Sequence, residues 1–120
     1  MRKKVLIVDD SLYMRKLIKN ALIDEGYEIV GEAHNGDTAI ELALNLLPDL
    51  ITLDNILPDM IGADVLKTLK DENVVSKVLM ISAVGQKTVI EEGIKLGATE
   101  YLVKPFTSED LVEAVNRILK

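Results

Sequence analysis

Five short runs of mostly aliphatic residues recur along the chain, and such runs are typical of strands buried on both faces of a parallel sheet. They lie at Val5–Val8, Tyr27–Ala33, Leu50–Leu53, Val78–Ile81 and Tyr101–Val103. After each run, apolar residues recur every three or four positions, which predicts an amphipathic helix. The helical stretches lie at Met14–Leu22, Ala39–Leu47, Val65–Leu69, Val89–Ile94 and Leu111–Leu119.

Residues that interrupt regular structure separate these elements. Gly26, Pro48 and Gly97 each follow a helical stretch and are expected to end it. Before the last helix, Thr107 and Asp110 have the spacing of a capping box, with Asp in place of the usual Glu. The chain therefore contains five successive strand–helix units.

This alternation predicts an α/β fold, in which a five-stranded parallel sheet is doubly wound and carries helices on both faces. We expect the five βα units to form a single domain over residues 1–120, because domains usually contain about 100–200 residues.

The composition excludes several classes of protein. The 120 residues are 48% hydrophobic and 28% charged, as in globular proteins, and the absence of cysteine excludes disulfides, thiol catalysis and thiolate metal sites. The formal net charge is −6, whereas a nucleic-acid-binding protein needs a basic face. The apolar runs are too short for a signal peptide or a membrane span. We therefore expect a cytoplasmic protein with no nucleic-acid partner and no membrane insertion.

Polar side chains follow four of the five predicted strands. Asp9 and Asp10 follow the first strand, Asp54 the third, Ser82 the fourth and Lys104 the fifth. The carboxyl ends of parallel strands form the ligand-binding edge of such sheets. Three carboxylates, one hydroxyl and one ammonium group are therefore expected to converge there.

This set of groups suits a particular chemistry. Several carboxylates without sulfur or imidazole ligands favour a hard cation such as Mg²⁺. A carboxylate beside Mg²⁺ can attack a phosphoryl group whose oxygens are neutralised by the metal and an ammonium group. The residues therefore predict formation of an aspartyl phosphate.

Four segments resemble the signature set of response-regulator receiver domains. They are Val8–Asp10, Leu53–Pro58, Ser82–Ala83 and Lys104–Phe106. The resemblance extends over the whole chain. It implies a flavodoxin-like fold with strand order 2-1-3-4-5 and a role in two-component signal transduction, in which a histidine kinase is the phosphodonor.

The resemblance also implies a role for each residue of the site. Asp54 would be the phosphoacceptor. Asp10, Asp54 and the backbone carbonyl of Ile56 would bind Mg²⁺ directly, and Asp9 would reach the ion through water. Lys104 would pair with the phosphoryl oxygens, and the peptide bond that follows it would be cis.

The resemblance also implies a conformational switch that follows phosphorylation. Ser82 would move toward the phosphoryl group and Tyr101 would turn inward behind it. The fourth helix, fifth strand and fifth helix would then present an altered face to a downstream protein. Such a domain is a monomeric phospho-accepting switch rather than an enzyme, with self-directed phosphotransfer and slow autodephosphorylation.

The segment Ser82–Gln86 resembles the chemotaxis type of receiver. A phosphorelay intermediate and a receiver fragment of a longer regulator remain as alternatives. A phosphatase of the haloacid-dehalogenase type is disfavoured, because Ile56 stands where a second Asp would be required. A flavodoxin-like cofactor carrier is disfavoured because Asp9 and Asp10 would repel a phosphate.

The resemblance also implies that Ile56 and Val84 flank the path by which water attacks the phosphoryl group. Both side chains are apolar and cannot orient that water. Ile61 stands where Asp or Asn usually precedes Gly62, and Met60 with Ile61 is a candidate partner contact.

Overall fold

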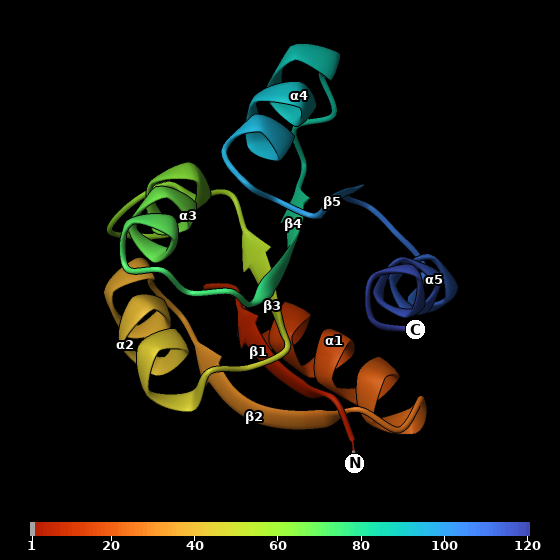
Figure 1. The fold of residues 1–120 in the computed structure, drawn as a ribbon. Coiled ribbons are helices and arrows are strands. Elements are labelled where there is room, and N and C mark those ends of the chain that lie inside the picture. Colours follow the sequence, from red (N-terminus) through yellow and green to blue (C-terminus); the bar gives the residue numbers. More distant parts are fainter. Residues whose placement is uncertain (1) are drawn as a thin grey trace.

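Five parallel strands and five helices alternate along the chain (Figure 1). The computed structural model describes residues 2–120. The strands are β1 (Lys4–Val8), β2 (Glu28–Ala33), β3 (Leu50–Asp54), β4 (Lys77–Ser82) and β5 (Glu100–Val103). The helices are α1 (Leu12–Asp24), α2 (Gly36–Leu46), α3 (Gly62–Asp71), α4 (Lys87–Lys95) and α5 (Ser108–Leu119). The predicted βα alternation is confirmed.

The strands form one sheet in the order β2-β1-β3-β4-β5, with every pair parallel. Helices α1 and α5 pack on one face, whereas α2 and α3 pack on the other (Figure 1). The expected doubly wound topology is therefore confirmed. Strand order reverses between β1 and β3, and ligands of such folds bind at the carboxyl ends of the strands at this reversal.

Alternate residues of the central strands enter two separate cores. In β1, Val5 and Ile7 pack with α1 and α5, whereas Leu6 and Val8 pack with α2 and α3. Strands β3 and β4 are buried in the same way, except at Lys77. The edge strands β2 and β5 are mostly half-buried, because an edge strand has one neighbouring strand and less helix cover.

Helix α2 differs from its predicted apolar face. Leu44 and Leu47 have the spacing of its apolar side, but both side chains are exposed. The helix ends at Leu46, and Leu47 takes a left-handed conformation with φ of 45° that turns the chain toward Pro48. The buried residues of α2 are Gly36, Ala39 and Ala43.

The starts of three helices are capped by side chains, and at α2 Oδ1 of Asn35 accepts a hydrogen bond from the N–H of Thr38. The hydroxyl of Ser11 accepts a hydrogen bond from the N–H of Met14 at the start of α1. Thr107 and Asp110 form the predicted capping box at the start of α5. Within residues 2–120, none of the helices is long and apolar enough to cross a membrane.

Candidate functional site

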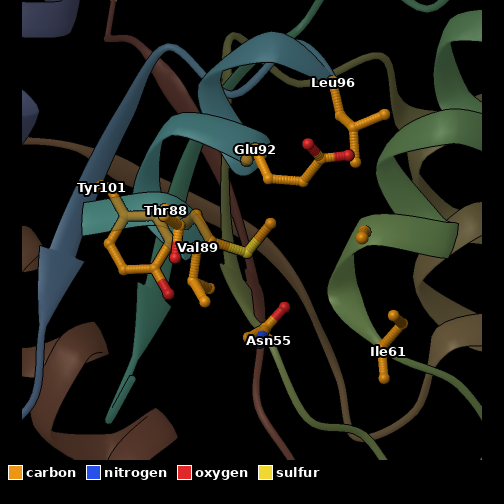
Figure 2. Close-up of a pocket in the computed structure, with 10 residues that line it drawn as sticks. Asn55, Ile61, Thr88, Val89, Glu92, Leu96 and Tyr101 are labelled. Carbon is orange, nitrogen blue, oxygen red and sulfur yellow. The ribbon is translucent and has the colours of Figure 1, made fainter. Parts of the chain in front are cut away.

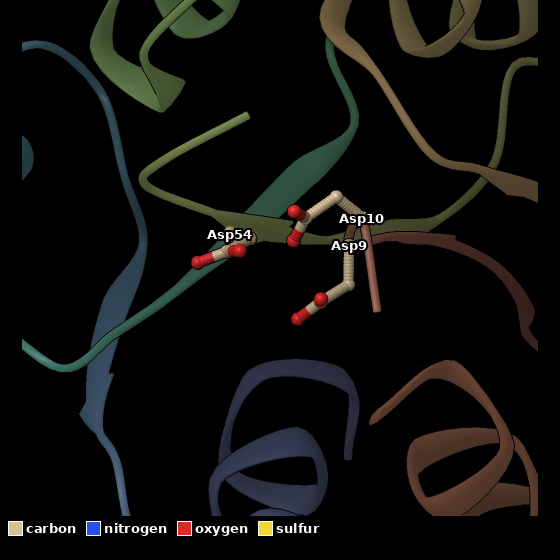
Figure 3. A group of neighbouring side chains, drawn as sticks. All are labelled: Asp9, Asp10 and Asp54. Atoms are coloured by element: carbon tan, nitrogen blue, oxygen red, sulfur yellow. The ribbon is translucent and has the colours of Figure 1, made fainter. Parts of the chain in front are cut away.

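Three carboxylates meet at the carboxyl edge of the two central strands (Figure 3). Asp9 and Asp10 directly follow β1, and Asp54 is the last residue of the neighbouring β3. One carboxylate oxygen of each residue lies within 4.8 Å of the others. The parallel register of β1 and β3 thus brings together acids that are more than forty positions apart.

Asp9 is 1% exposed, and both of its carboxylate oxygens have protein partners. Oδ1 accepts a hydrogen bond of 2.9 Å from the backbone N–H of Ser11. Oδ2 lies 3.2 Å from Nζ of Lys104. The side chain of Asp10, in contrast, is exposed. Asp10 and Asp54 are therefore better placed than Asp9 to give oxygen atoms directly to a cation.

Lys104 follows β5 and reaches across the site to the acids. Its Nζ lies 3.5 Å from Oδ1 of Asp54 in addition to its contact with Asp9. Its backbone N–H donates to the carbonyl of Ser82 at 2.8 Å, which holds the ends of β4 and β5 together. The Lys104–Pro105 bond is cis.

Burial raises the pKa of Asp54 above its ordinary value, and the negative charge of Asp9 raises this pKa further. The charge of Lys104 and a hydrogen bond from the backbone N–H of Ile56 act in the opposite direction. Ionisation of Asp54 is therefore less favourable than that of an ordinary, exposed aspartate.

The loop between β3 and α3 folds back closely over the end of β3. The N–H of Gly62 donates to the carbonyl of Asn55 at 2.6 Å. A Cβ at position 62 would lie 2.8 Å from the carbonyl oxygen of Asp54 and 2.9 Å from Cα of Asn55. Only glycine permits this approach without displacing backbone. The loop also carries Ile56, whose side chain is 62% exposed.

Ser82 and Tyr101 are linked through one residue of the loop after β4. The hydroxyl of Ser82, a residue that is 2% exposed, accepts a hydrogen bond of 3.1 Å from the N–H of Val84. The hydroxyl of Tyr101 donates to the carbonyl of the same Val84 at 2.9 Å. A change in the position of Ser82 would therefore act on a residue that also holds Tyr101.

The ring of half-buried Tyr101 borders a cavity of about 410 Å³ between α3 and α4 (Figure 2). The cavity is lined mainly by apolar residues, and Asn55 lies at its other side (Figure 2). Because Asn55 directly follows Asp54, the cavity extends from the residue after β3 to α4 and Tyr101 of β5.

A family model for the response regulator receiver domain matches residues 5–116. The chain belongs to this receiver family. The assignment agrees with the four signature segments found in the sequence.

Individual relatives resemble this receiver over their full length. It is 42% identical to chemotaxis protein CheY of Thermotoga maritima over 120 residues, which is 100% of each chain. It is 40% identical to chemotaxis protein CheY of Bacillus subtilis over 119 residues, which is 99% of each chain. These similarities support a response regulator of the chemotaxis type.

Solved receiver structures have the same fold. The CheX–CheY–BeF3–Mg complex from Borrelia burgdorferi contains a chain that matches with a TM-score of 0.94 and 29% identity, covering 98% of this chain and 90% of that chain. Chemotaxis response regulator CheY4 of Vibrio cholerae matches with a TM-score of 0.92 and 33% identity, covering 99% and 100% respectively.

The receiver contains two further polar residues whose tertiary contacts were not predicted from its sequence. Nη1 of Arg15 donates to the backbone carbonyl of Asp9 at 2.7 Å, and its Nε pairs with Glu32 at 3.2 Å. The only feature of the sequence that pointed to these contacts was the position of Arg15, a cation shortly after Asp9 and Asp10. Arg15 ties the start of α1 to the end of β1 and to β2.

Asp59 is the second such residue. Its carboxylate accepts hydrogen bonds of 2.7 and 3.0 Å from the N–H groups of Gly36 and Asp37 at the start of α2. These bonds hold the pKa of Asp59 below its ordinary value. Met60 packs against Gly36 in the same contact. Nothing in the sequence signalled a partner more than twenty residues away.

Proposed function

We propose that this receiver accepts a phosphoryl group on Asp54 from the phosphohistidine of a kinase, and that the phosphorylated form binds a downstream protein through α4, β5 and α5. The observation that carries this proposal is the position of Asp54. Its carboxylate is 8% exposed, lies within 4.8 Å of two other acids, and has an ammonium group at 3.5 Å.

The acid cluster suits Mg²⁺, because its donors are carboxylate oxygens. Asp10, Asp54 and the backbone carbonyl of Ile56 would bind the ion directly, and Asp9 would act through water. The two protein contacts already made by Asp9 support this division. When bound, Mg²⁺ would neutralise phosphoryl oxygens and the excess negative charge of the acids.

In the transfer, a carboxylate oxygen of Asp54 forms a bond to phosphorus while the bond between phosphorus and the kinase imidazole breaks. The imidazole nitrogen keeps the electron pair of the broken bond. Lys104 would exchange its contact with Asp54 for a contact with the new phosphoryl oxygens, where charge-assisted hydrogen bonds are strong. The chain would act as a substrate of the kinase and as a switch.

The conformational change would be transmitted from Ser82 to Tyr101 through Val84. Ser82 would leave the N–H of Val84 and donate its hydroxyl to the phosphoryl group. Because Tyr101 is held by the carbonyl of Val84, its position would respond to that movement. Ser82 and Tyr101 would therefore be the switch residues.

The names of the full-length relatives support a chemotaxis role, with a target in a sensory or motor complex. We propose that a single receiver domain over residues 1–120 acts as a monomer. Because the phosphoryl group of a histidine kinase derives from ATP, we place this action in the cytoplasm. Slow loss of phosphate would be self-catalysed at the same site.

Transfer from a radiolabelled, autophosphorylated histidine kinase tests the proposal. The wild-type chain should gain label when Mg²⁺ is present and not in EDTA. Asp54→Asn should gain none, whereas the control Asp64→Asn, which changes an exposed acid on α3, should be labelled like wild type. Label on Asp54→Asn would overturn the proposal. Onward transfer to a histidine phosphotransfer domain would identify a phosphorelay intermediate instead of a chemotaxis switch.

A further inference from the structure

The loop between β3 and α3, residues 55–61, is closed by contacts between its own two arms. Ile56 and Ile61 form an antiparallel bridge, and the N–H of Leu57 donates to the carbonyl of Met60 at 3.1 Å. Because these contacts join the arm that leaves β3 to the arm that enters α3, a residue at the tip of the loop can influence the position of residues at the end of β3.

The tip of this loop is attached to α2, a helix that contributes no residue to the acid cluster. Oδ1 of Asp59 accepts a hydrogen bond of 2.7 Å from the N–H of Gly36, and Oδ2 accepts one of 3.0 Å from the N–H of Asp37. Both N–H groups belong to the first turn, where backbone donors have no partner within the helix. The N-cap Asn35 accepts from a different donor, the N–H of Thr38. Asp59 therefore supplies acceptors that the N-cap does not.

Met60 adds an apolar contact at the same point. A Cβ atom at position 36 would overlap Cγ of Met60, so the glycine allows the loop to lie directly against the start of α2. Gly36 is buried there. The loop and α2 are thus joined by two hydrogen bonds and one close packing contact.

Ile56 belongs to the same loop and lies three residues before Asp59. Its N–H donates to the carboxylate of Asp54, so this part of the loop lies beside the acid cluster. The proposed function assigns the backbone carbonyl of Ile56 as a ligand of Mg²⁺. A ligand that is already held in place loses less conformational freedom on binding than a ligand on a mobile segment.

We propose that Asp59 is a positioning residue for Mg²⁺, whose two hydrogen bonds to the start of α2 hold the loop so that Ile56 can present its carbonyl to the ion. The inference rests on the proposed function, because it takes Ile56 as a ligand. It adds that the start of α2 contributes to metal affinity through Asp59 and Gly36, without direct contact with the ion.

Titration of the ¹⁵N-labelled chain with Mg²⁺, followed through its amide shifts, tests this inference at a temperature where every variant is folded. Asp59→Ala should raise the Kd for Mg²⁺ at least about fivefold, because replacing a residue that orients metal ligands commonly lowers affinity about 10–100-fold. Asp59→Asn keeps one oxygen as an acceptor and should raise the Kd less. Asp37→Ala removes the same charge from the same helical turn but keeps both N–H donors, and should change the Kd less than about twofold.

A variant of α2 tests the same contact from its other side. Gly36→Ala leaves the charge unchanged and favours the helix, but its methyl group would displace Met60 and the loop. It should raise the Kd at least about threefold. Ala43→Gly destabilises α2 away from this contact and should leave the Kd within about twofold of wild type. In EDTA, hydrogen exchange at the N–H of Leu57 should be faster in Asp59→Ala and Gly36→Ala than in wild type.

Three results would overturn the inference. They are a Kd of Asp59→Ala within about twofold of wild type, equal weakening by Asp37→Ala, and Kd values that follow the melting temperature across all variants, Ala43→Gly included. A wild-type chain without Mg²⁺-dependent shifts at residues 9, 10 and 54 would instead overturn the proposed function. Hydrogen exchange in EDTA would still show whether Asp59 fixes the loop, so failures of the two proposals can be told apart.

Discussion

Nζ of Lys104 lies 3.2 Å from Oδ2 of Asp9, a carboxylate that is almost fully buried. This single ammonium group also contacts Asp54, so it serves two acids while a third acid lies beside them. The metal-free site therefore has more negative than positive charge among these four side chains. Replacing either an acid or the lysine of this site should change both the thermal stability of the protein and its response to phosphorylation.

Removal of Asp10 should stabilise the metal-free protein. Two carboxylates about 4 Å apart repel by about 1 kcal/mol in water and about 4 kcal/mol at an effective dielectric constant near 20. Because Asp10 is exposed, we expect a value near the lower figure. Asp10→Ala should raise the melting temperature in EDTA by a few degrees and abolish the further rise caused by Mg²⁺. Glu41→Ala, an exposed change on α2, should retain that rise, and an Asp10→Ala protein less stable than wild type in EDTA would contradict a converged acid site.

Removal of Lys104 should have the opposite effect on stability in EDTA. Asp9 would lose the ammonium partner of a buried carboxylate, which costs about 1–3 kcal/mol. Lys104→Ala should therefore unfold at lower temperature, still bind Mg²⁺, and lose the response to phosphorylation. The response is measured as amide shifts in residues 86–119 on phosphorylation. Lys87→Ala, which removes an exposed cation of α4, should keep these shifts, and their persistence in Lys104→Ala would show that Lys104 does not couple the site to α4 and α5.

The raised pKa of Asp54 predicts a defined pH dependence. A folded-state pKa above the unfolded value favours folding when the carboxyl is protonated, and this contribution is lost as pH rises through the folded-state pKa. In EDTA, Asp54→Asn should therefore be more stable than wild type at pH 7, and the difference should shrink as the pH falls toward 4. Urea unfolding of both proteins across this range measures the difference. A gap that stayed constant or widened on acidification would contradict a raised pKa.

The apolar pair Ile56 and Val84 should slow the loss of phosphate. Neither side chain can hydrogen-bond a water aligned with the bond between Asp54 and phosphorus, and alignment of a reactant can change rates tenfold or more. Ile56→Asn with Val84→Glu should accelerate dephosphorylation at least several-fold while phosphorylation and Mg²⁺ binding survive. The backbone contacts of Val84 with Ser82 and Tyr101 do not involve its side chain.

Decay of the phosphoprotein after removal of the donor measures this effect. Ile23→Asn with Val75→Glu is a matched control, because it introduces the same two side chains at exposed positions outside the site. Its decay should resemble that of wild type. An unchanged or slower decay in the Ile56 and Val84 variant would show that these side chains do not control access of water.

The fold could be predicted from the sequence because its signals are local. Runs such as Val5–Val8 and Val78–Ile81 identify the central strands, and the spacing of Thr107 and Asp110 identifies the start of α5. In α2 the same reasoning failed. Helical spacing did not reveal that Leu44 faces solvent or that the helix ends before Leu47.

The acids at the strand ends could be predicted to converge because parallel register is set by the fold. The contacts of Arg15 with Asp9 and of Asp59 with the start of α2 could not, because they depend on how loops and helices pack in three dimensions. The shared contact of Ser82 and Tyr101 with Val84 belongs to the same group. Local patterns therefore identified the chemical groups, and tertiary packing determined how they are held.

Intact mass after treatment with acetyl phosphate and Mg²⁺ tests the central assignment of Asp54 most directly. The wild-type chain and the exposed-acid control Asp64→Asn should each gain the mass of one phosphoryl group. Asp54→Asn should gain none, because its amide cannot act as the attacking carboxylate. A phosphoryl adduct on Asp54→Asn, or two adducts on wild type, would contradict the account.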